Sequence, residues 1–317
     1  MIISMKKQVL AAGFVLSSFF VLPLKASAAN FSQIYAFGDS LVDTGNAYNF
    51  IKTTTGVEFP PSPPYFDGHF SNGPIWVEGL SSALGITQTN FAFGGATTGT
   101  LNTVNGNLPG LAQQIQGFTT ANSQADSKAL YVIWAGANDY RAGVINPAEP
   151  VNNLINAVKS LASVGAEHFL LVNLPNLGAL PGTSNNPTVS AGLTALSTAH
   201  NSGLAAGINT LNQQPDIHVT LLDANSLFNK AIASPGEFGY TNVTDACLTI
   251  TSPTSFTTCP NPNEYLFWDQ LHPTTYTHSF LAGAALVAVP ESSPALGVLA
   301  LGALGTVGVL KKRQRTH

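Results

Sequence analysis

Four short apolar segments recur along the chain, and each ends at a turn-forming or polar residue. They span 34–37 before Gly38, 130–134 before Gly136, 169–172 before Asn173, and 219–222 before Asp223. Consecutive positions in these segments are apolar, so both faces of each segment are suited to burial. This pattern predicts the buried strands of a parallel sheet.

Segments with helical spacing lie between these strands. Leu154, Val158 and Leu161 share one helix face, and a longer helical pattern runs from Leu193 to Leu211. Strands that alternate with helices predict an α/β fold, namely a flavodoxin-like three-layer α/β/α sandwich around a central parallel sheet. Segments 181–187 and 253–262 are rich in Pro, Ser, Thr and Asn, and we predict surface loops there.

The first 28 residues have the pattern of a signal peptide. Lys6 and Lys7 precede an apolar run over 8–24, and Ala26-Ser27-Ala28 has the small-x-small pattern of a cleavage site. We therefore expect export, with a mature chain that begins near Ala29. The alternative is an uncleaved membrane anchor, for which the apolar run is short.

Residues 289–317 form a second terminal segment with its own pattern. Val289-Pro290-Glu291 precedes an apolar run over 292–310 and a basic cluster over 311–315. This layout resembles the PEP-CTERM sorting tail of Gram-negative bacteria, although its second proline comes late. The resemblance implies transient membrane association, processing by an exosortase-type enzyme, and a final place at the cell surface, in the extracellular matrix or outside the cell. The alternative is a permanent C-terminal anchor.

A single domain is expected between these segments, over residues 29–288. Seven of the 12 Lys and Arg residues lie in the terminal segments, which leaves 5 basic residues against 15 of the 16 acidic ones. A nucleic-acid partner is therefore not expected, because binding along a nucleic-acid backbone draws on clustered Lys and Arg.

Cys247 and Cys259 are the 2 cysteines of the chain. In an exported protein, such a pair predicts a disulfide that closes a short loop. A pair of free, buried thiols is the alternative. A zinc site is not expected, because no matching pair of histidines accompanies the cysteines.

Ser40 is the candidate nucleophile, because it directly follows the first predicted strand, where ligands of parallel sheets bind. A serine needs a base, and the base works best when a third group orients it. Asp269-Gln270-Leu271-His272 offers both within one turn. Gly94-Gly95 and Asn138 offer donors for an oxyanion. Each motif alone also fits an ordinary turn, as glycine pairs and Asn-Asp often do.

Taken together and in this order, these motifs resemble the GDSL (SGNH) hydrolase family over residues 31–288. Segments 43–46, 71–78 and 265–269 match that family as well, and the Gly-x-Ser-x-Gly elbow of other lipases is absent from the sequence. The resemblance implies that Ser40 is the nucleophile, His272 the base and then the acid, and Asp269 the group that orients His272.

The family pattern also assigns the oxyanion hole. It implies the N–H of Ser40, the N–H of Gly95 and the side chain of Asn138. Gly95 is preferred over Gly94 because the family's glycine precedes a small residue and then a threonine, as in Ala96-Thr97. Two acidic residues near the nucleophile, Asp39 and Asp43, are expected to brace the turn by hydrogen bonds.

The resemblance implies a serine hydrolase that cleaves carboxylic esters of lipids or acylated glycans, and the signal-peptide pattern adds that it is exported. No metal or cofactor is expected, because a side-chain base activates the serine. An acyltransferase or a polysaccharide O-deacetylase on the same site is an alternative, and so is a catalytically silent surface or matrix protein. The proline-rich segment 60–66 is either the edge of an acyl pocket or a rigid surface loop.

Overall fold

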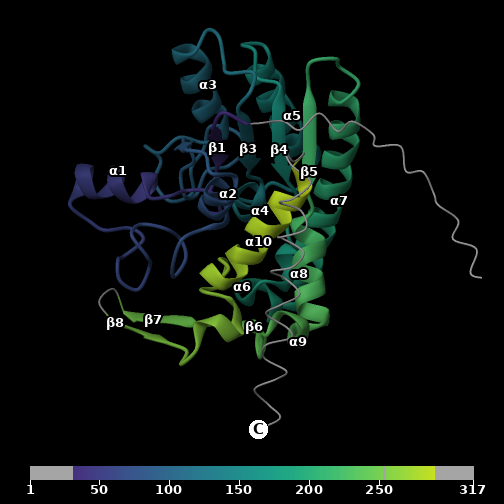
Figure 1. Ribbon diagram of the computed structural model, residues 1–317. Coiled ribbons are helices and arrows are strands. Elements are labelled where there is room, and N and C mark those ends of the chain that lie inside the picture. The colour runs from purple at the N-terminus through teal and green to yellow at the C-terminus, as the bar shows by residue number, and fades with distance from the viewer. Residues whose placement is uncertain (1–30, 253–254, 290–317) are drawn as a thin grey trace, which may run out of the picture.

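The computed structural model describes residues 31–252 and 255–289. The predicted signal peptide and, apart from Val289, the predicted sorting tail lie outside the described residues. Figure 1 shows a central sheet with helices on both faces. The predicted α/β class and three-layer arrangement are therefore confirmed.

Five parallel strands form the central sheet in the order β2-β1-β3-β4-β5. Four of them are the strands that the apolar segments predict. The strands are β1 Ile34–Gly38, β2 Gln88–Asn90, β3 Leu130–Trp134, β4 His168–Val172 and β5 His218–Leu222. The short edge strand β2 has no buried residue, so the apolar pattern does not reveal it.

Apart from the edge strand β2, the strands of the central sheet contribute side chains to two separate cores on opposite faces. In β1, Ile34 and Ala36 enter one core, whereas Tyr35 and Phe37 face the other. Helices α2 Trp76–Leu84, α8 Ala224–Ala233 and α10 Thr275–Ala288 cover the first core, and α3 Leu111–Ala121, α5 Ala148–Ala162 and α7 Pro187–Leu211 cover the second. Helices on both faces explain why these strands are apolar at consecutive positions.

The prediction of loops over 181–187 and 253–262 is wrong in part. Pro181–Ser184 forms helix α6, and α7 already begins at Pro187, because a proline suits the first turn of a helix. Asn186 caps α7 by accepting a hydrogen bond from the Val189 amide at 3.2 Å. In the second segment, Ser255–Thr258 forms strand β8, which pairs antiparallel with β7 Leu248–Ser252.

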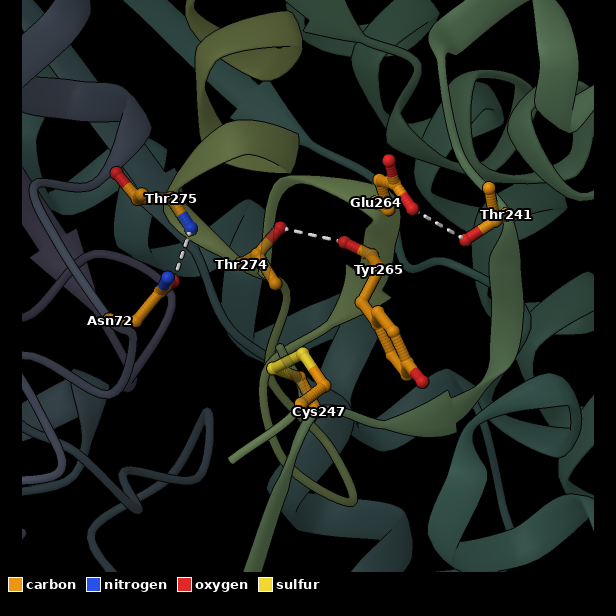
Figure 2. Close-up of a disulfide and its surroundings, with 8 residues drawn as sticks. Asn72, Thr241, Cys247, Glu264, Tyr265, Thr274 and Thr275 are labelled. Carbon is orange, nitrogen blue, oxygen red and sulfur yellow. Dashed lines mark hydrogen bonds between the residues drawn. A yellow bond between two sulfur atoms is a disulfide. The ribbon is translucent and has the colours of Figure 1, made fainter. Parts of the chain in front are cut away.

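The predicted disulfide is present, and it closes the base of the β7–β8 hairpin (Figure 2). The Cys259 amide also donates to the Cys247 carbonyl at 2.8 Å. Cys247 and Leu248 pack with Tyr65 and Trp268 in a small core of their own. The hairpin is therefore attached to the segment that carries Asp269.

The remaining elements are short or lie at the carboxyl edge of the sheet. They are α1 Asn46–Thr55, α4 Ala137–Arg141, η1 Leu177–Ala179, α9 Pro235–Phe238, β6 Asn242–Ala246, η2 Pro262–Glu264 and β9 Tyr265–Phe267. Strands β6 and β9 pair with each other, outside the central sheet. Among the described residues, no helix is both long and apolar enough to cross a membrane.

Candidate active site

The sequence-predicted residues meet at the carboxyl edge of the central sheet. Ser40 follows β1, and Asn138 lies on the short helix α4 that follows β3. Asp269 and His272 lie in the turn between β9 and α10. Parallel strands place their carboxyl ends at one edge, which brings Ser40 after β1 and Asn138 after β3 together. The turn after β9, a strand outside the central sheet, brings His272 to the same edge, 232 positions from Ser40.

Ser40, His272 and Asp269 form a continuous hydrogen-bonded line. The Oγ of Ser40 lies 2.8 Å from Nε2 of His272. On the other side of the ring, Nδ1 of His272 lies 2.7 Å from Oδ2 of Asp269. The side chains of His272 and Asp269 are each only 12% exposed. This arrangement can move a proton from the serine to the imidazole while the carboxylate orients the ring.

Asp269 is held as an anion by its surroundings. Its Oδ1 accepts hydrogen bonds from the Leu271 and His272 amides at 2.7 Å each, and its Oδ2 accepts one from the Tyr65 hydroxyl at 2.7 Å. Burial by itself would raise the pKa of Asp269, but the nearby His272 and these hydrogen bonds lower it below its ordinary value. The carboxylate therefore stays charged beside the imidazole.

Ser40 stands on a turn that only glycine permits. Gly38, the last residue of β1, has φ of 144°, and a Cβ there would lie 2.0 Å from the Trp134 carbonyl oxygen. The chain can therefore pass close to β3 before it turns outward at Ser40. A side chain at position 38 would push the nucleophile away from the sheet edge.

Asp39 and Asp43 brace this turn, in agreement with their expected role. Asp39 Oδ1 accepts from the Leu41 amide at 3.0 Å. Asp43 accepts from the Gly45 amide at 2.9 Å, and also from the Gly94 amide at 2.7 Å, which ties the two loops together. Burial raises the pKa of Asp39 to about 7.

The two glycines after β2 differ in the use of their backbone amides. The Gly94 N–H is occupied by Asp43, whereas the N–H groups of Gly95 and Ser40 have no hydrogen-bond partner among the described residues. Gly95 has φ of 83°, and a Cβ there would meet the side chain of Asn102 at 2.7 Å. The free amides of Gly95 and Ser40 are suited to bind an oxyanion.

Asn138 supplies a third donor in the same region. Its Nδ2 donates to the Ala96 carbonyl at 3.1 Å and more weakly to Asp39 Oδ2 at 3.4 Å. The second contact is longer than an ordinary N–H···O hydrogen bond. The Nδ2 proton that points to Asp39 can therefore be redirected to a developing negative charge on a substrate at low cost in free energy.

Tyr65 lies in the proline-rich segment 60–66, and its role in the site was not predicted from the sequence. The side chain of Tyr65 is buried and donates to Asp269, so this segment supports the carboxylate from behind. The cavity beside Ser40 is lined by other parts of the chain. Aromatic character after a proline run is the only sequence signal for this role.

Segment 71–75 holds the chain just after His272. The Ser71 hydroxyl donates to the Pro273 carbonyl at 2.9 Å, and Asn72 Oδ1 accepts from the Thr275 amide at 2.8 Å. The Thr275 hydroxyl in turn donates to the Pro74 carbonyl at 2.7 Å. These three bonds fix the start of α10 and hence the position of the imidazole.

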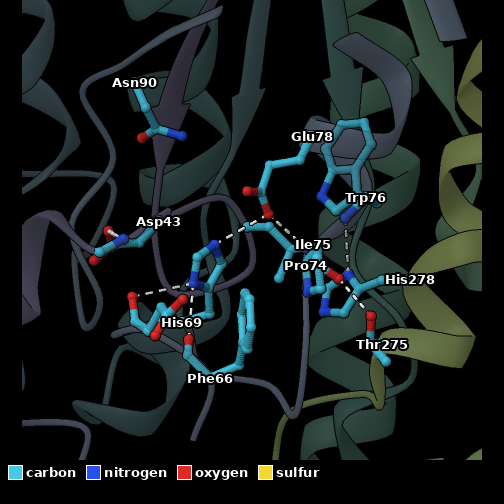
Figure 3. Close-up of polar contacts among 12 residues, drawn as sticks. Asp43, Phe66, His69, Pro74, Ile75, Trp76, Glu78, Asn90, Thr275 and His278 are labelled. Carbon is cyan, nitrogen blue, oxygen red and sulfur yellow. Dashed lines mark hydrogen bonds and ion pairs between the residues drawn. The ribbon is translucent and has the colours of Figure 1, made fainter. Parts of the chain in front are cut away.

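A histidine–carboxylate pair holds the same segment to helix α2 (Figure 3). Nε2 of His69 lies 3.0 Å from Oε2 of Glu78, which also accepts from the Ile75 amide at 2.7 Å. Burial would lower the pKa of His69, but the hydrogen bond to Glu78 raises it above its ordinary value. The His69 side chain is buried and that of Glu78 is partly exposed, and the pair supports the turn without a contact to Ser40.

A cavity opens beside the hydrogen-bonded line. Its wall is mainly apolar and comes from the turn after β1, from α4, η1, α6 and α7, and from the turn that carries His272. The lining residues are Asp39, Ser40, Leu41, Ala137, Asn138, Arg141, Pro175, Leu177, Leu180, Thr183, Leu193, Leu271 and His272. Within the described part of the chain, no group of His, Cys, Asp or Glu side chains is placed to hold a metal ion.

Comparison with known proteins points to one family. The family model described as "GDSL-like Lipase/Acylhydrolase" matches residues 34–285. A phosphatidylcholine-sterol acyltransferase of Aeromonas hydrophila is 30% identical over 307 residues, which cover 80% of this chain and 89% of that protein. A GDSL esterase/lipase of Arabidopsis thaliana is 27% identical, and the match covers 80% of each chain.

Solved structures include a carbohydrate acetylesterase family member from Sinorhizobium meliloti. It has 15% sequence identity and a TM-score of 0.49, and the match covers 81% of this chain and 96% of that one.

Proposed function

The chain belongs to the GDSL-like lipase/acylhydrolase family and is a serine ester hydrolase, and from this premise we propose that Ser40 carries the acyl group during catalysis. The observation that supports this proposal is the continuous line from Ser40 through His272 to Asp269. It has the geometry of an activated nucleophile with an oriented base.

The proposed reaction has two halves. In the first, Nε2 of His272 takes the proton of the Ser40 hydroxyl while Oγ bonds to the ester carbonyl carbon. The N–H groups of Ser40 and Gly95 and the Asn138 amide then bind the oxyanion. His272 returns the proton to the departing alcohol, which leaves the acyl group on Ser40. In the second half, His272 takes a proton from a water molecule whose oxygen bonds to the acyl carbon. The bond from that carbon to Ser40 Oγ then breaks, His272 returns the proton to Oγ, and the carboxylic acid leaves.

The substrate that we propose is a lipid-like ester with an acyl chain longer than acetyl. The cavity beside Ser40 is lined by several leucines, among them Leu177, Leu180 and Leu193, and apolar surface favours an alkyl chain over a sugar. An O-deacetylase would need polar partners for a glycan, and this wall offers few of them.

Acyl transfer is a second candidate, because the Aeromonas relative is named as an acyltransferase. A transferase would use the same acyl-enzyme but would pass the acyl group to an alcohol other than water. Product analysis with a sterol or glycerol acceptor present distinguishes the two activities. Acylated acceptor in excess of free fatty acid would favour transfer.

For the whole chain, we propose three regions and an exported destination. Residues 1–28 would direct export and be removed, residues 29–288 would form the hydrolase domain, and residues 289–317 would be the PEP-CTERM-type tail. Processing by an exosortase-type enzyme would leave the hydrolase at the cell surface or outside the cell. Mass spectrometry of the protein from its host tests both cleavages.

Labelling with a fluorophosphonate tests the role of Ser40. The wild-type protein should react at one serine, and Ser40→Ala should abolish the label and the hydrolysis of p-nitrophenyl esters. Ser202→Ala, which changes an exposed serine of α7, is the matched control and should keep both. Persistent labelling of a folded Ser40→Ala variant would refute the proposal.

A further inference from the structure

The cavity beside Ser40 contains a single cationic side chain, Arg141. The other two arginines of the chain, Arg313 and Arg315, lie outside the described residues. Arg141 makes no ion pair and no hydrogen bond through its side chain with any residue that the structure describes. Its guanidinium therefore has five N–H donors available for a ligand.

Helix α4 holds Arg141 in place through its other polar side chains. Asn138 bonds to Ala96, and Asp139 accepts from both the amide and the hydroxyl of Thr98, at 2.9 and 2.5 Å. The Tyr140 hydroxyl lies 2.9 Å from Nδ1 of the buried His200. Three consecutive residues are thus fixed, and Arg141 is the polar residue of α4 that remains unpaired.

Asn138 and Arg141 are three positions apart, so they lie on the same side of the helix. Both line the cavity, as do Ser40 and His272. A group bound by Arg141 would therefore belong to the same molecule whose ester lies at Ser40. Between 29 and 289 the chain has 15 acidic residues and 5 basic ones, so this guanidinium is not part of a general basic surface.

We infer that Arg141 binds an anionic group of the substrate, a phosphate or a carboxylate, while the leucines of the same cavity hold its alkyl chain. This inference rests on the proposed function of Ser40. Arg141 lines the cavity and is exposed, so its guanidinium is accessible to a ligand. A guanidinium forms bidentate, charge-assisted hydrogen bonds with either group. Arg141 is thus a specificity-determining residue, and the preferred substrate is an amphiphilic ester with a negative charge.

Steady-state kinetics on three esters of one acyl chain length test the inference. One is neutral (a monoacylglycerol), one has a phosphate on the alcohol (a lysophosphatidate), and one has a terminal carboxylate on the acyl chain. Arg141→Gln should lower the ratio of kcat/KM for an anionic ester to that for the neutral ester by about tenfold to a hundredfold, mainly through KM. A ratio that falls for the lysophosphatidate places the bound charge on the alcohol part of the substrate. A ratio that falls for the other anionic ester places it on the acyl chain.

Two further variants make the test specific. Arg141→Lys should have a ratio of kcat/KM values between those of wild type and Arg141→Gln, because lysine keeps the charge but loses the bidentate geometry. Lys128→Gln removes an exposed cation at the opposite edge of the sheet and should leave the ratio unchanged. An unchanged ratio in Arg141→Gln, for both anionic esters, overturns the inference. If the wild-type protein neither reacts with a fluorophosphonate nor cleaves any ester, then the proposed function itself has failed.

Discussion

At the scale of single residues, the site depends on donors and acceptors that have few competing partners. The amides of Ser40 and Gly95 are free among the described residues, whereas neighbouring Gly94 is occupied by Asp43. Asn138 and Tyr65 each make hydrogen bonds that link a loop to the site. These residues therefore allow sharp tests by substitution.

Asn138→Ala is expected to lower kcat by roughly a hundredfold or more. Loss of one oxyanion donor costs about 3 kcal/mol of transition-state stabilisation in such sites. Steady-state turnover of a p-nitrophenyl ester measures the effect. Asn229→Ala, at an exposed position of α8, serves as the control and should be as active as the wild type. Near-normal turnover of folded Asn138→Ala would exclude Asn138 from the oxyanion hole.

Tyr65→Phe is expected to lower kcat by about tenfold, because Asp269 loses a hydrogen bond worth on the order of 1 to 2 kcal/mol. Labelling of Ser40 should become slower but should not vanish. Tyr276→Phe removes a comparable hydroxyl, which donates to the Phe238 carbonyl away from the site, and should leave kcat unchanged. Equal losses of activity in the two variants would show that Tyr65 has no special role.

At the scale of elements, the β7–β8 hairpin couples the disulfide to the site. The Leu248 amide donates to the Trp268 carbonyl at 2.7 Å, directly before Asp269 in the chain. Leu248 and Cys247 also pack against Trp268 and Tyr65. Loosening of this hairpin should therefore reach the carboxylate that orients His272.

Replacement of both Cys247 and Cys259 by serine is expected to lower the free energy of unfolding. The bridge joins residues 12 positions apart, and a loop of that size contributes about 3 kcal/mol in the chain-entropy description. Chemical denaturation followed by fluorescence measures the change. Ile250→Ala, at an exposed position in the same hairpin, should have little effect. Equal denaturation midpoints for the wild type and the double variant would show that the disulfide does not stabilise the fold.

At the scale of the whole molecule, buried titratable groups make stability depend on pH. Burial lowers the pKa of His200 to about 4, whereas an unfolded histidine titrates near about 6.5. Between these values the unfolded chain binds a proton that the folded chain does not, so stability falls as the pH drops through this window. The pKa of Asp39 is raised to about 7, so below that pH the folded chain holds a proton that the unfolded chain releases. The contribution of Asp39 to stability therefore grows as the pH falls from about 7.

A variant isolates the contribution of His200 from that of Asp39. His200→Gln should be less stable than wild type at pH 7, because it loses packing and the contact with Tyr140. The difference in free energy of unfolding between wild type and variant should narrow by on the order of 3 kcal/mol as the pH falls to about 4. Denaturation curves at several pH values measure it. A difference that stays constant with pH would contradict the assignment.

The sequence alone determined the features that depend on local order. Strands buried on both faces appear as consecutive apolar residues, and four of the five central strands were predictable for that reason. The short edge strand β2 lacks this pattern, as do the strands of the β7–β8 hairpin, which are almost entirely exposed. The turn that joins Asp269 to His272 is also local, since both hydrogen bonds to Asp269 Oδ1 come from within three residues.

Only the tertiary structure decided which of these residues meet. Ser40 and His272 are 232 positions apart, and Tyr65 and Asp269 are 204 apart, so their contacts depend on how the sheet and loops pack. The occupied amide of Gly94 and the unpaired side chain of Arg141 are likewise visible only in three dimensions. Periodicity in a sequence reports which face of an element is buried, but not which distant side chain lies against it.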